Sequence, residues 1–292
     1  MPRARRKSLA VAALGLVGLV GGLALAQPPW GRGPFRQRQS PLDGIPADRA
    51  GVPDWKVDER FKDDVFTFAR VQYSSHSGMG RRGRGWGGPG WDTDWPDSDL
   101  NFSYRLQQLT SLKVNPNPVI VRLTEDRLFD YPFIYIIEPG GLVFSDEEVA
   151  ALRRYLLNGG FLMVDDFWGE YDYQNLYREL KRVFPDREPE ELDISHPVFQ
   201  MVYRLKERPQ VPSIHTWQYT GETWEDHGPG SREVHYRGIS DDKGRLMALI
   251  CHNTDLGDGW EREGENAEYF HEFSEKKSYP MGINIVTYAM TH

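Results

Sequence analysis

The chain has 292 residues, a formal net charge of −8 and one cysteine, Cys251. A chain this acidic lacks the positive field that attracts nucleic acid or an anionic membrane surface, and a lone cysteine excludes an internal disulfide. Its stability therefore has to come from a hydrophobic core, and the length is sufficient for one large domain.

Residues 1–26 are predicted to be a secretory signal peptide. Four basic residues precede the apolar stretch 9–26, which ends in the cleavage-site-like tripeptide Ala24-Leu25-Ala26. The alternative is an uncleaved membrane anchor, and the Arg5-Arg6 pair leaves twin-arginine export open. Cleavage after Ala26 would make the protein periplasmic or extracellular. It would also move the net charge to −12, because the segment holds four basic and no acidic residues.

Residues 27–60 are predicted to form a flexible linker, because six prolines lie in a polar run that has few residues to bury. A single domain is expected over 61–292. It opens with the β-rich segment 65–73, a predicted strand. Seven glycines interleaved with arginines predict a mobile loop over 77–90.

The central part alternates between predicted helices and strands. A helix is expected over 100–112, with Asp97 or Ser98 as its N-cap, followed by strands over 118–123 and 133–138. Ser145 and Glu148 form a capping box that opens a helix ending near Gly159. The apolar run 161–164 predicts a strand buried on both faces, and 173–184 predicts another helix.

The last third predicts a β-hairpin over 233–251 and a buried C-terminal helix over 281–290. Together these elements predict an α/β fold: a mostly parallel sheet with helices on both faces, plus a C-terminal β-hairpin.

Several segments carry a family resemblance. They are 129–135, 152–166 and 253–261, together with Asp94-Trp95-Pro96 and Gly282-Ile283-Asn284. With them the chain resembles the bacterial family called domain of unknown function 4159. The resemblance implies a flavodoxin-like sheet similar to that of class I glutamine amidotransferases. It also implies partner binding, since relatives often accompany von Willebrand-type and AAA-ATPase-linked membrane proteins. The family has no established activity.

Asp165 and Asp166 are the leading candidate site residues, with Trp168 beside them. They directly follow the predicted strand 161–164, and ligands of open parallel sheets bind beyond the carboxyl ends of the strands. Two carboxylates there can hold a hard cation, or one can act as a general base. In the alternative interpretation, one caps the next turn and the other is solvated.

Two further segments supply candidate ligand-binding residues. Asn253, Asp255 and Trp260 lie after the second hairpin strand and are expected to line the same cleft; the alternative is a glycine-rich turn with Asx caps. Asp92 and Asp94 belong to an acidic cluster that can bind a cation or a sugar. Charge complementing a helix N-terminus explains Asp97 and Asp99 but leaves Asp92 and Asp94 unexplained.

The sequence argues against amidotransferase chemistry. A nucleophile elbow at Cys251 would need small residues two places before and after it, where Leu249 and Asn253 stand, and no helical pattern is recognisable after it. Cys251 is therefore expected to be a buried, inert thiol.

Two functions remain as hypotheses. The first is a non-catalytic exported module that binds an envelope protein or a glycan across the strand ends. The second is a metal-assisted hydrolase of a cell-envelope substrate, in which Asp165 or Asp166 acts as base or metal ligand and His196 or His252 assists. No organic cofactor is expected, the metal is undetermined, and membrane contact would come only through a retained signal segment.

Overall fold

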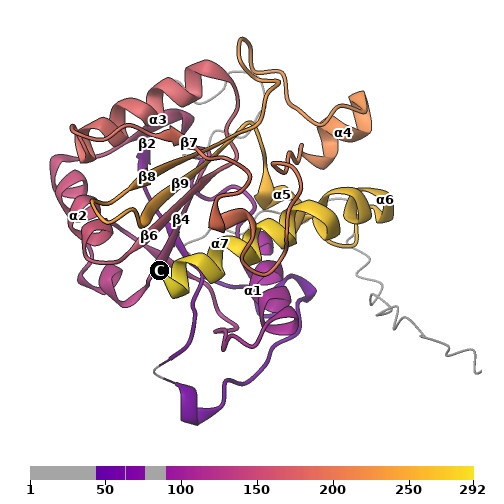
Figure 1. The fold of residues 1–292 in the computed structure, drawn as a ribbon. Helices are drawn as coiled ribbons and strands as arrows, with labels where there is room; N and C mark the ends of the chain where they lie inside the picture. The colour runs from indigo at the N-terminus through magenta and orange to yellow at the C-terminus, as the bar shows by residue number, and fades with distance from the viewer. Residues whose placement is uncertain (1–43, 63, 76–89) are drawn as a thin grey trace, which may run out of the picture.

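The computed structural model describes residues 44–62, 64–75 and 90–292. A seven-stranded sheet with the order β3-β1-β4-β6-β9-β8-β7 forms its centre (Figure 1). The first five of these strands run parallel, whereas β8 and β7 are antiparallel to their neighbours. The sheet strands are β1 (Ala69–Val71), β3 (Val119–Val121), β4 (Phe133–Ile137), β6 (Phe161–Asp165), β7 (Glu190–Glu191), β8 (His235–Ser240) and β9 (Leu246–His252). A separate antiparallel pair joins β2 (Ser74–Ser75) to β5 (Leu142–Val143).

Helices cover both faces of this sheet (Figure 1). On one face lie α2 (Asp146–Leu157) and α3 (Gly169–Val183), which contribute Leu152, Leu156, Leu176 and Leu180 to a buried cluster. On the other face lie α1 (Asp97–Leu109), α5 (Leu256–Glu261) and α7 (Tyr279–Thr291). The remaining helices are α4 (Ile214–Thr220), α6 (Ala267–Tyr269) and the π-helix η7 (Phe270–Ser278), with short 3₁₀ turns between elements.

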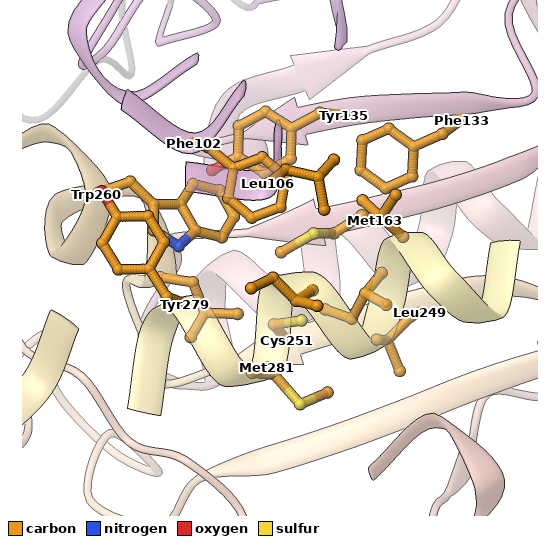
Figure 2. Close-up of a cluster of buried hydrophobic side chains, with 14 of the residues drawn as sticks. Phe102, Leu106, Phe133, Tyr135, Met163, Leu249, Cys251, Trp260, Tyr279 and Met281 are labelled. Carbon is orange, nitrogen blue, oxygen red and sulfur yellow. The ribbon is translucent and has the colours of Figure 1, made fainter. Parts of the chain in front are cut away.

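The core on the α7 side is largely aromatic. Phe102 from α1 and Trp260 from α5 pack with ring centroids 4.5 Å apart, and Tyr135 of β4 lies against the same indole (Figure 2). Met163 and Leu249, from two neighbouring strands, lie beneath α7 in the same cluster (Figure 2). This packing fixes α5 at the end of β4, where the candidate site lies.

The structure confirms a mixed α/β fold with a mostly parallel central sheet. The capping box of Ser145 and Glu148 is confirmed, and so is the buried strand ending at Asp165. The C-terminal helix is also confirmed, as α7. The predicted hairpin strands correspond to β8 and β9, but β9 is no addition to the sheet: it pairs in parallel with β6 at the centre.

Three local predictions were wrong. The helix α1 begins at Asp97 and has Pro96 at its N-cap, so neither Asp97 nor Ser98 caps it. The helix α3 begins at Gly169 instead of near Tyr173. The sequence shows no helical pattern after β9, but the helix α5 follows this strand. Gly257 and Gly259 have a low helix propensity, which is why the sequence pattern does not predict α5.

The described part of the predicted linker packs on the domain. Ala50 and Val52 are buried against Leu100 of α1, and the indole N–H of Trp55 donates to the carbonyl of Val114 (2.8 Å). The signal-peptide prediction and the 77–90 loop prediction, apart from Gly90, lie outside the described residues. Within residues 44–62, 64–75 and 90–292, no helix combines the length and apolar character that crossing a bilayer requires.

Candidate functional site

The candidate site lies at the carboxyl ends of β4, β6 and β9. Glu138, Asp166 and Asn253 directly follow these strands, and all three adopt a left-handed backbone, with φ of +48°, +54° and +60°. Asp94, in the turn before α1, has φ of +61°. Left-handed backbone is uncommon for residues other than glycine, and such strain tends to concentrate at functional sites.

Two groups of carboxylates converge there. One oxygen each from Asp94, Asp166 and Asp255 lie within 4.8 Å of one another, and we call this group the strand-end triad. The same spacing holds for Asp94, Asp258 and Glu261, which we call the α5 triad. Asp94 belongs to both, so the two triads form one continuous acidic basin.

The basin is largely closed to solvent. Asp94, Asp255 and Asp258 are buried, while Asp166 and Glu261 are half-buried. Within the basin, solvent exposure is therefore greatest at Asp166 and Glu261.

Charged groups lie around each triad. In the α5 triad, Nε of Arg262 lies 3.2 Å from Asp258 and 2.5 Å from Glu261. In the strand-end triad, burial raises the pKa of Asp166 and of Asp255 well above the ordinary value, and nearby acids raise it further. Apart from burial, the leading influences on the pKa of both groups come from other carboxylates.

Asp165 forms the inner wall of the basin. Its Oδ2 accepts hydrogen bonds from the Tyr135 hydroxyl (3.2 Å) and from the backbone N–H of Gly257 (3.0 Å). Its Oδ1 is fully buried and has no hydrogen-bond partner among the described residues. Burial raises the pKa of Asp165 to about 7.

Gly257 brings these groups close together. A Cβ at this position would lie 3.0 Å from the Tyr135 hydroxyl and 3.1 Å from Oδ2 of Asp94. The backbone of α5 can therefore approach Asp165 and Asp94 only because residue 257 has no side chain.

Arg70 holds the turn that carries Asp94. Its fully buried guanidinium donates to the carbonyls of Trp91 (3.1 Å) and Thr93 (2.7 Å). It also forms a two-point ion pair with the buried Asp99 of α1. The turn that carries Asp94 is thus fixed to β1 by backbone contacts on the N-terminal side of Asp94.

Of the residues proposed from the sequence, Asp94, Asp166 and Asp255 are brought together, and Asp165 lies beside them. Asp92 is half-buried in the preceding turn, where its carbonyl accepts from the Trp95 N–H (3.3 Å). Asp255 also caps α5, because its Oδ1 accepts from the N–H of Asp258 (2.7 Å). The Asx cap and the cleft-lining role, posed as alternatives for this residue, are therefore compatible.

The other three proposed ligand-binding residues are built into the scaffold. Asn253 accepts from the N–H of Gly169 (2.8 Å), and its amide donates to two carbonyls of the 230–233 loop. Trp260 is fully buried in the aromatic core, and Trp168 is buried at the N-cap of α3. Trp91 and Trp95 are buried as well, so these four tryptophans belong to the packed interior.

His252 is occupied away from the carboxylates. Because arginine only donates, Nδ1 of His252 accepts from Arg237 (3.0 Å), and Nε2–H donates to the carbonyl of Gly169 (3.0 Å). Burial lowers the pKa of His252 to about 3, so the ring is neutral.

His196 lies at the opposite end of the sheet. Its ring packs on the ring of Tyr288, with the two ring centroids 5.9 Å apart. The Tyr288 hydroxyl accepts a hydrogen bond from the N–H of Leu246 at the start of β9. Nδ1 of His196 accepts from the N–H of Val198 (3.2 Å). Neither candidate histidine is thus placed to assist at the basin.

Cys251 is fully buried within β9, and burial raises the pKa of its thiol well above the ordinary value. The next helix begins five residues later, at Leu256, so no strand-to-helix turn presents the sulfur. This environment is that of an unreactive thiol.

The sequence analysis did not identify three charged residues of this site: Asp258, Glu261 and Arg262. The spacing Asp255-x-x-Asp258-x-x-Glu261 places acids every three residues, which aligns them along one side of a helix. That pattern could have revealed the α5 triad, but the helix itself was not recognised.

Comparison with known families gave one result that covers most of the chain. The family described as "Domain of unknown function (DUF4159)" matches residues 67–290. A search of the curated proteins found no match to this chain.

Proposed function

Because this chain belongs to the family described as "Domain of unknown function (DUF4159)", whose description names no activity, we propose a function from the site itself. The strand-end triad of Asp94, Asp166 and Asp255 binds one hard divalent cation, and that cation holds an oxygen-bearing ligand. The protein acts as a cation-dependent binding module.

The observation that carries this proposal is the convergence of three carboxylates in the strand-end triad. Three carboxylates within 4.8 Å of one another repel in a largely buried setting, where such charges are costly unless they are paired or coordinate a metal. Neighbouring carboxylates raise the pKa of both Asp166 and Asp255, as this repulsion predicts. The unpartnered Oδ1 of Asp165, beside the triad, is a second buried oxygen that a cation or its bound water would satisfy.

The ligand atoms indicate the class of ion. Carboxylate oxygens suit Mg²⁺, Ca²⁺ or Mn²⁺ over the softer metals that favour thiolate or imidazole. Three carboxylates fill only part of a shell of six to eight oxygens, so positions remain for water or for a ligand. Further acids nearby, Glu138 and Glu225, favour a neutral oxygen ligand such as a sugar hydroxyl or a peptide carbonyl over an anion.

The proposal includes compartment and partner. We propose that residues 1–26 export the protein to the periplasm or beyond and that its ligand is an envelope glycan or protein. We also propose that the sheet and its helices are a variant of the flavodoxin-like, class I glutamine amidotransferase-like arrangement.

Calorimetric titration with Ca²⁺, Mn²⁺ and Mg²⁺ tests the cation site. We expect one equivalent of cation to bind the wild-type chain. Asp166→Asn and Asp255→Asn should each weaken binding by about tenfold or more, the scale seen when parts of a metal site are removed. Asp130→Asn, at an exposed position before β4, is the matched control and should bind as the wild type does. Equal affinity in all four proteins would refute the proposed function.

Hydrolysis is the second candidate, and the position of Asp165 favours it. Its unpartnered Oδ1 lies beside the proposed cation, where a group that takes a proton from a bound water would stand. Cation-dependent turnover of ester, glycoside or peptide substrates that is lost in Asp165→Asn would support a hydrolase. Cation-dependent ligand binding without turnover would support the binding module.

A further inference from the structure

We propose that Asn158 is a site of spontaneous chemical modification, at which the backbone nitrogen of Gly159 attacks the side-chain amide and releases ammonia. The products are aspartate and isoaspartate, and water is the only co-reactant. The site lies in the turn between α2 and the start of β6, whereas the acidic basin lies at the other end of that strand. The modification does not depend on cation binding.

The sequence and the exposure of this turn carry the first step. Asn158 and Gly159 form the one Asn-Gly pair of the sequence. Asparagine is a thermolabile residue, and a following glycine has no side chain to block the approach of its nitrogen to the amide carbon. Both residues are exposed, and within the described part of the chain no hydrogen bond holds the Asn158 side chain. A Cβ at position 159 would meet no heavy atom within 4 Å, so the turn has room to move.

The backbone of the turn holds the attacking nitrogen weakly. The helix α2 ends in a Schellman motif, in which Gly159 has a φ of +106° and the N–H of Gly160 donates to the carbonyl of Tyr155 (3.0 Å). The nitrogen of Gly159 lies 3.4 Å from the carbonyl oxygen of Leu156, beyond the roughly 2.7–3.2 Å of a normal N–H···O hydrogen bond. The nitrogen that must react is therefore the more weakly bound of the two donors.

Ring closure requires a rotation at Asn158. The five-membered ring needs Cβ of Asn158 and the nitrogen of Gly159 on the same side of the Cα–C bond, whereas the observed ψ of +16° keeps them apart. The rotation opens only the last turn of α2, and chain segments of this kind open at a free energy close to zero. The reaction is therefore accessible while the rest of the domain stays folded.

The chemistry is balanced with water alone. The Gly159 nitrogen gives its proton to the solvent and bonds to Cγ of Asn158. The Cγ–Nδ2 bond then breaks, and Nδ2 takes a proton from the solvent and leaves as ammonia. Water adds to one of the two carbonyl carbons of the cyclic imide. Opening at Cγ gives aspartate, whereas opening at the backbone carbonyl carbon gives isoaspartate, whose main chain runs through Cβ and Cγ.

Isoaspartate would disturb the contacts of Arg245, the residue before β9. Its guanidinium donates to the carbonyls of Leu156 (2.6 Å), Gly159 (3.3 Å) and Gly160 (3.1 Å). The longer main chain of isoaspartate enters between the first and second of these carbonyls. Gly160 cannot shift to make room, because even a Cβ there would lie 2.3 Å from the Tyr155 ring. The isoaspartate form should therefore be less stable than the unmodified protein.

The test is peptide mapping by mass spectrometry of the full chain, aged folded for several weeks at neutral pH and compared with the same chain aged in guanidinium chloride. We expect Asn158 to convert to a mixture of aspartate and isoaspartate. The rate in the folded chain should lie within about tenfold of the rate in the unfolded chain, because the turn opens at little cost. A folded-chain rate lower than this would mean that the turn protects Asn158, and the proposal would fail.

Asn158→Gln is the matched control. Glutamine keeps the amide at the exposed end of α2 but would have to close a six-membered ring, so we expect no conversion over the same period. Equal conversion of the variant would overturn the attack by the Gly159 nitrogen.

Thermal melting of the aged proteins measures the consequence for the fold. The aged wild type should show a second, lower transition whose share follows its isoaspartate content, while aged Asn158→Gln should melt as it does when fresh. An aged wild type that contains isoaspartate and yet melts as the fresh protein does would overturn the role given to the Arg245 contacts.

Discussion

Glycine at position 257 lets three polar groups meet that would otherwise be held apart. Its N–H donates to Asp165, and its missing side chain leaves room for the Tyr135 hydroxyl and for Asp94. Asp94 in turn depends on Arg70, which holds the carbonyls of the preceding turn from β1. The positions of the acids are therefore set by uncharged and basic neighbours as much as by the acids themselves.

Gly257→Ala tests this dependence. The new Cβ would press on Asp94 and Tyr135, so we expect cation affinity to fall by about tenfold, the scale of a disturbed supporting contact. Stability should change little, because alanine favours the helix α5 by up to about 1 kcal/mol. Calorimetry and thermal melting measure the two effects separately. The control is Gly141→Ala, whose Cβ would meet only the Ser75 Cβ at 3.8 Å; an equal loss of affinity there would contradict the account.

At the scale of elements, three parallel strands deliver their terminal residues to one edge of the sheet. The apolar run before Asp165 was enough to predict that Asp165 and Asp166 end a buried strand, since the run is short and ends abruptly in acids. A parallel strand before Asp255 would predict that Asp255 joins them, but the sequence pattern predicts β9 only as part of an added hairpin. Its pairing with β6 depends on tertiary packing that local patterns do not encode.

The turn carrying Asp94 was harder to place. It lies about seventy residues before Asp166 and reaches the basin because Arg70, buried in β1, holds it there. A buried arginine cannot be told from a surface one by sequence pattern. Asp258 and Glu261 were missed for a different reason: two glycines conceal α5, yet they are required because side chains there would collide with Tyr135 and Ser278.

His252 joins three elements, and its acid sensitivity can be measured. It lies on β9, accepts from Arg237 on β8 and donates to Gly169 at the start of α3. Its pKa is lowered to about 3, chiefly by burial, against 6.5 for the unfolded chain. Its contribution to stability is therefore present above pH 6.5 and is lost as the pH falls from 6.5 towards 3.

His252→Phe removes this titration while keeping a ring stacked on Phe167. Between pH 6.5 and 4.5 the wild type should lose roughly 2 kcal/mol more unfolding free energy than the variant does. Urea unfolding at the two pH values measures this difference. Parallel losses in both proteins would mean that His252 is not the group that takes up the proton.

At the scale of the whole molecule, repulsion between the carboxylates of the acidic basin lowers the stability of the fold, and the burial of apolar side chains in the two hydrophobic cores offsets this loss. The cores lie on opposite faces of the sheet, and the basin lies where α5, β4, β6 and β9 meet at its edge. A cation in the strand-end triad would turn this local repulsion into attraction. The stability of the whole domain should therefore depend on divalent ions.

Asp166→Asn is expected to change stability in opposite directions with and without cation. In EDTA at pH 8 the variant should be more stable than the wild type by roughly 1–2 kcal/mol, because a buried like charge is gone. With cation at a hundred times its Kd, the wild type should gain about 2.7 kcal/mol and the variant far less. Chemical denaturation under both conditions measures the four values; an equal gain in both proteins would exclude Asp166 as a ligand.

The most direct measurement of the central claim is the position of Mn²⁺ in crystals of the full chain, located by its anomalous scattering. The account predicts one peak between Asp94, Asp166 and Asp255, with carboxylate oxygens about 2.0–2.6 Å away. A peak between Asp258 and Glu261, or no peak at saturating Mn²⁺, would contradict it.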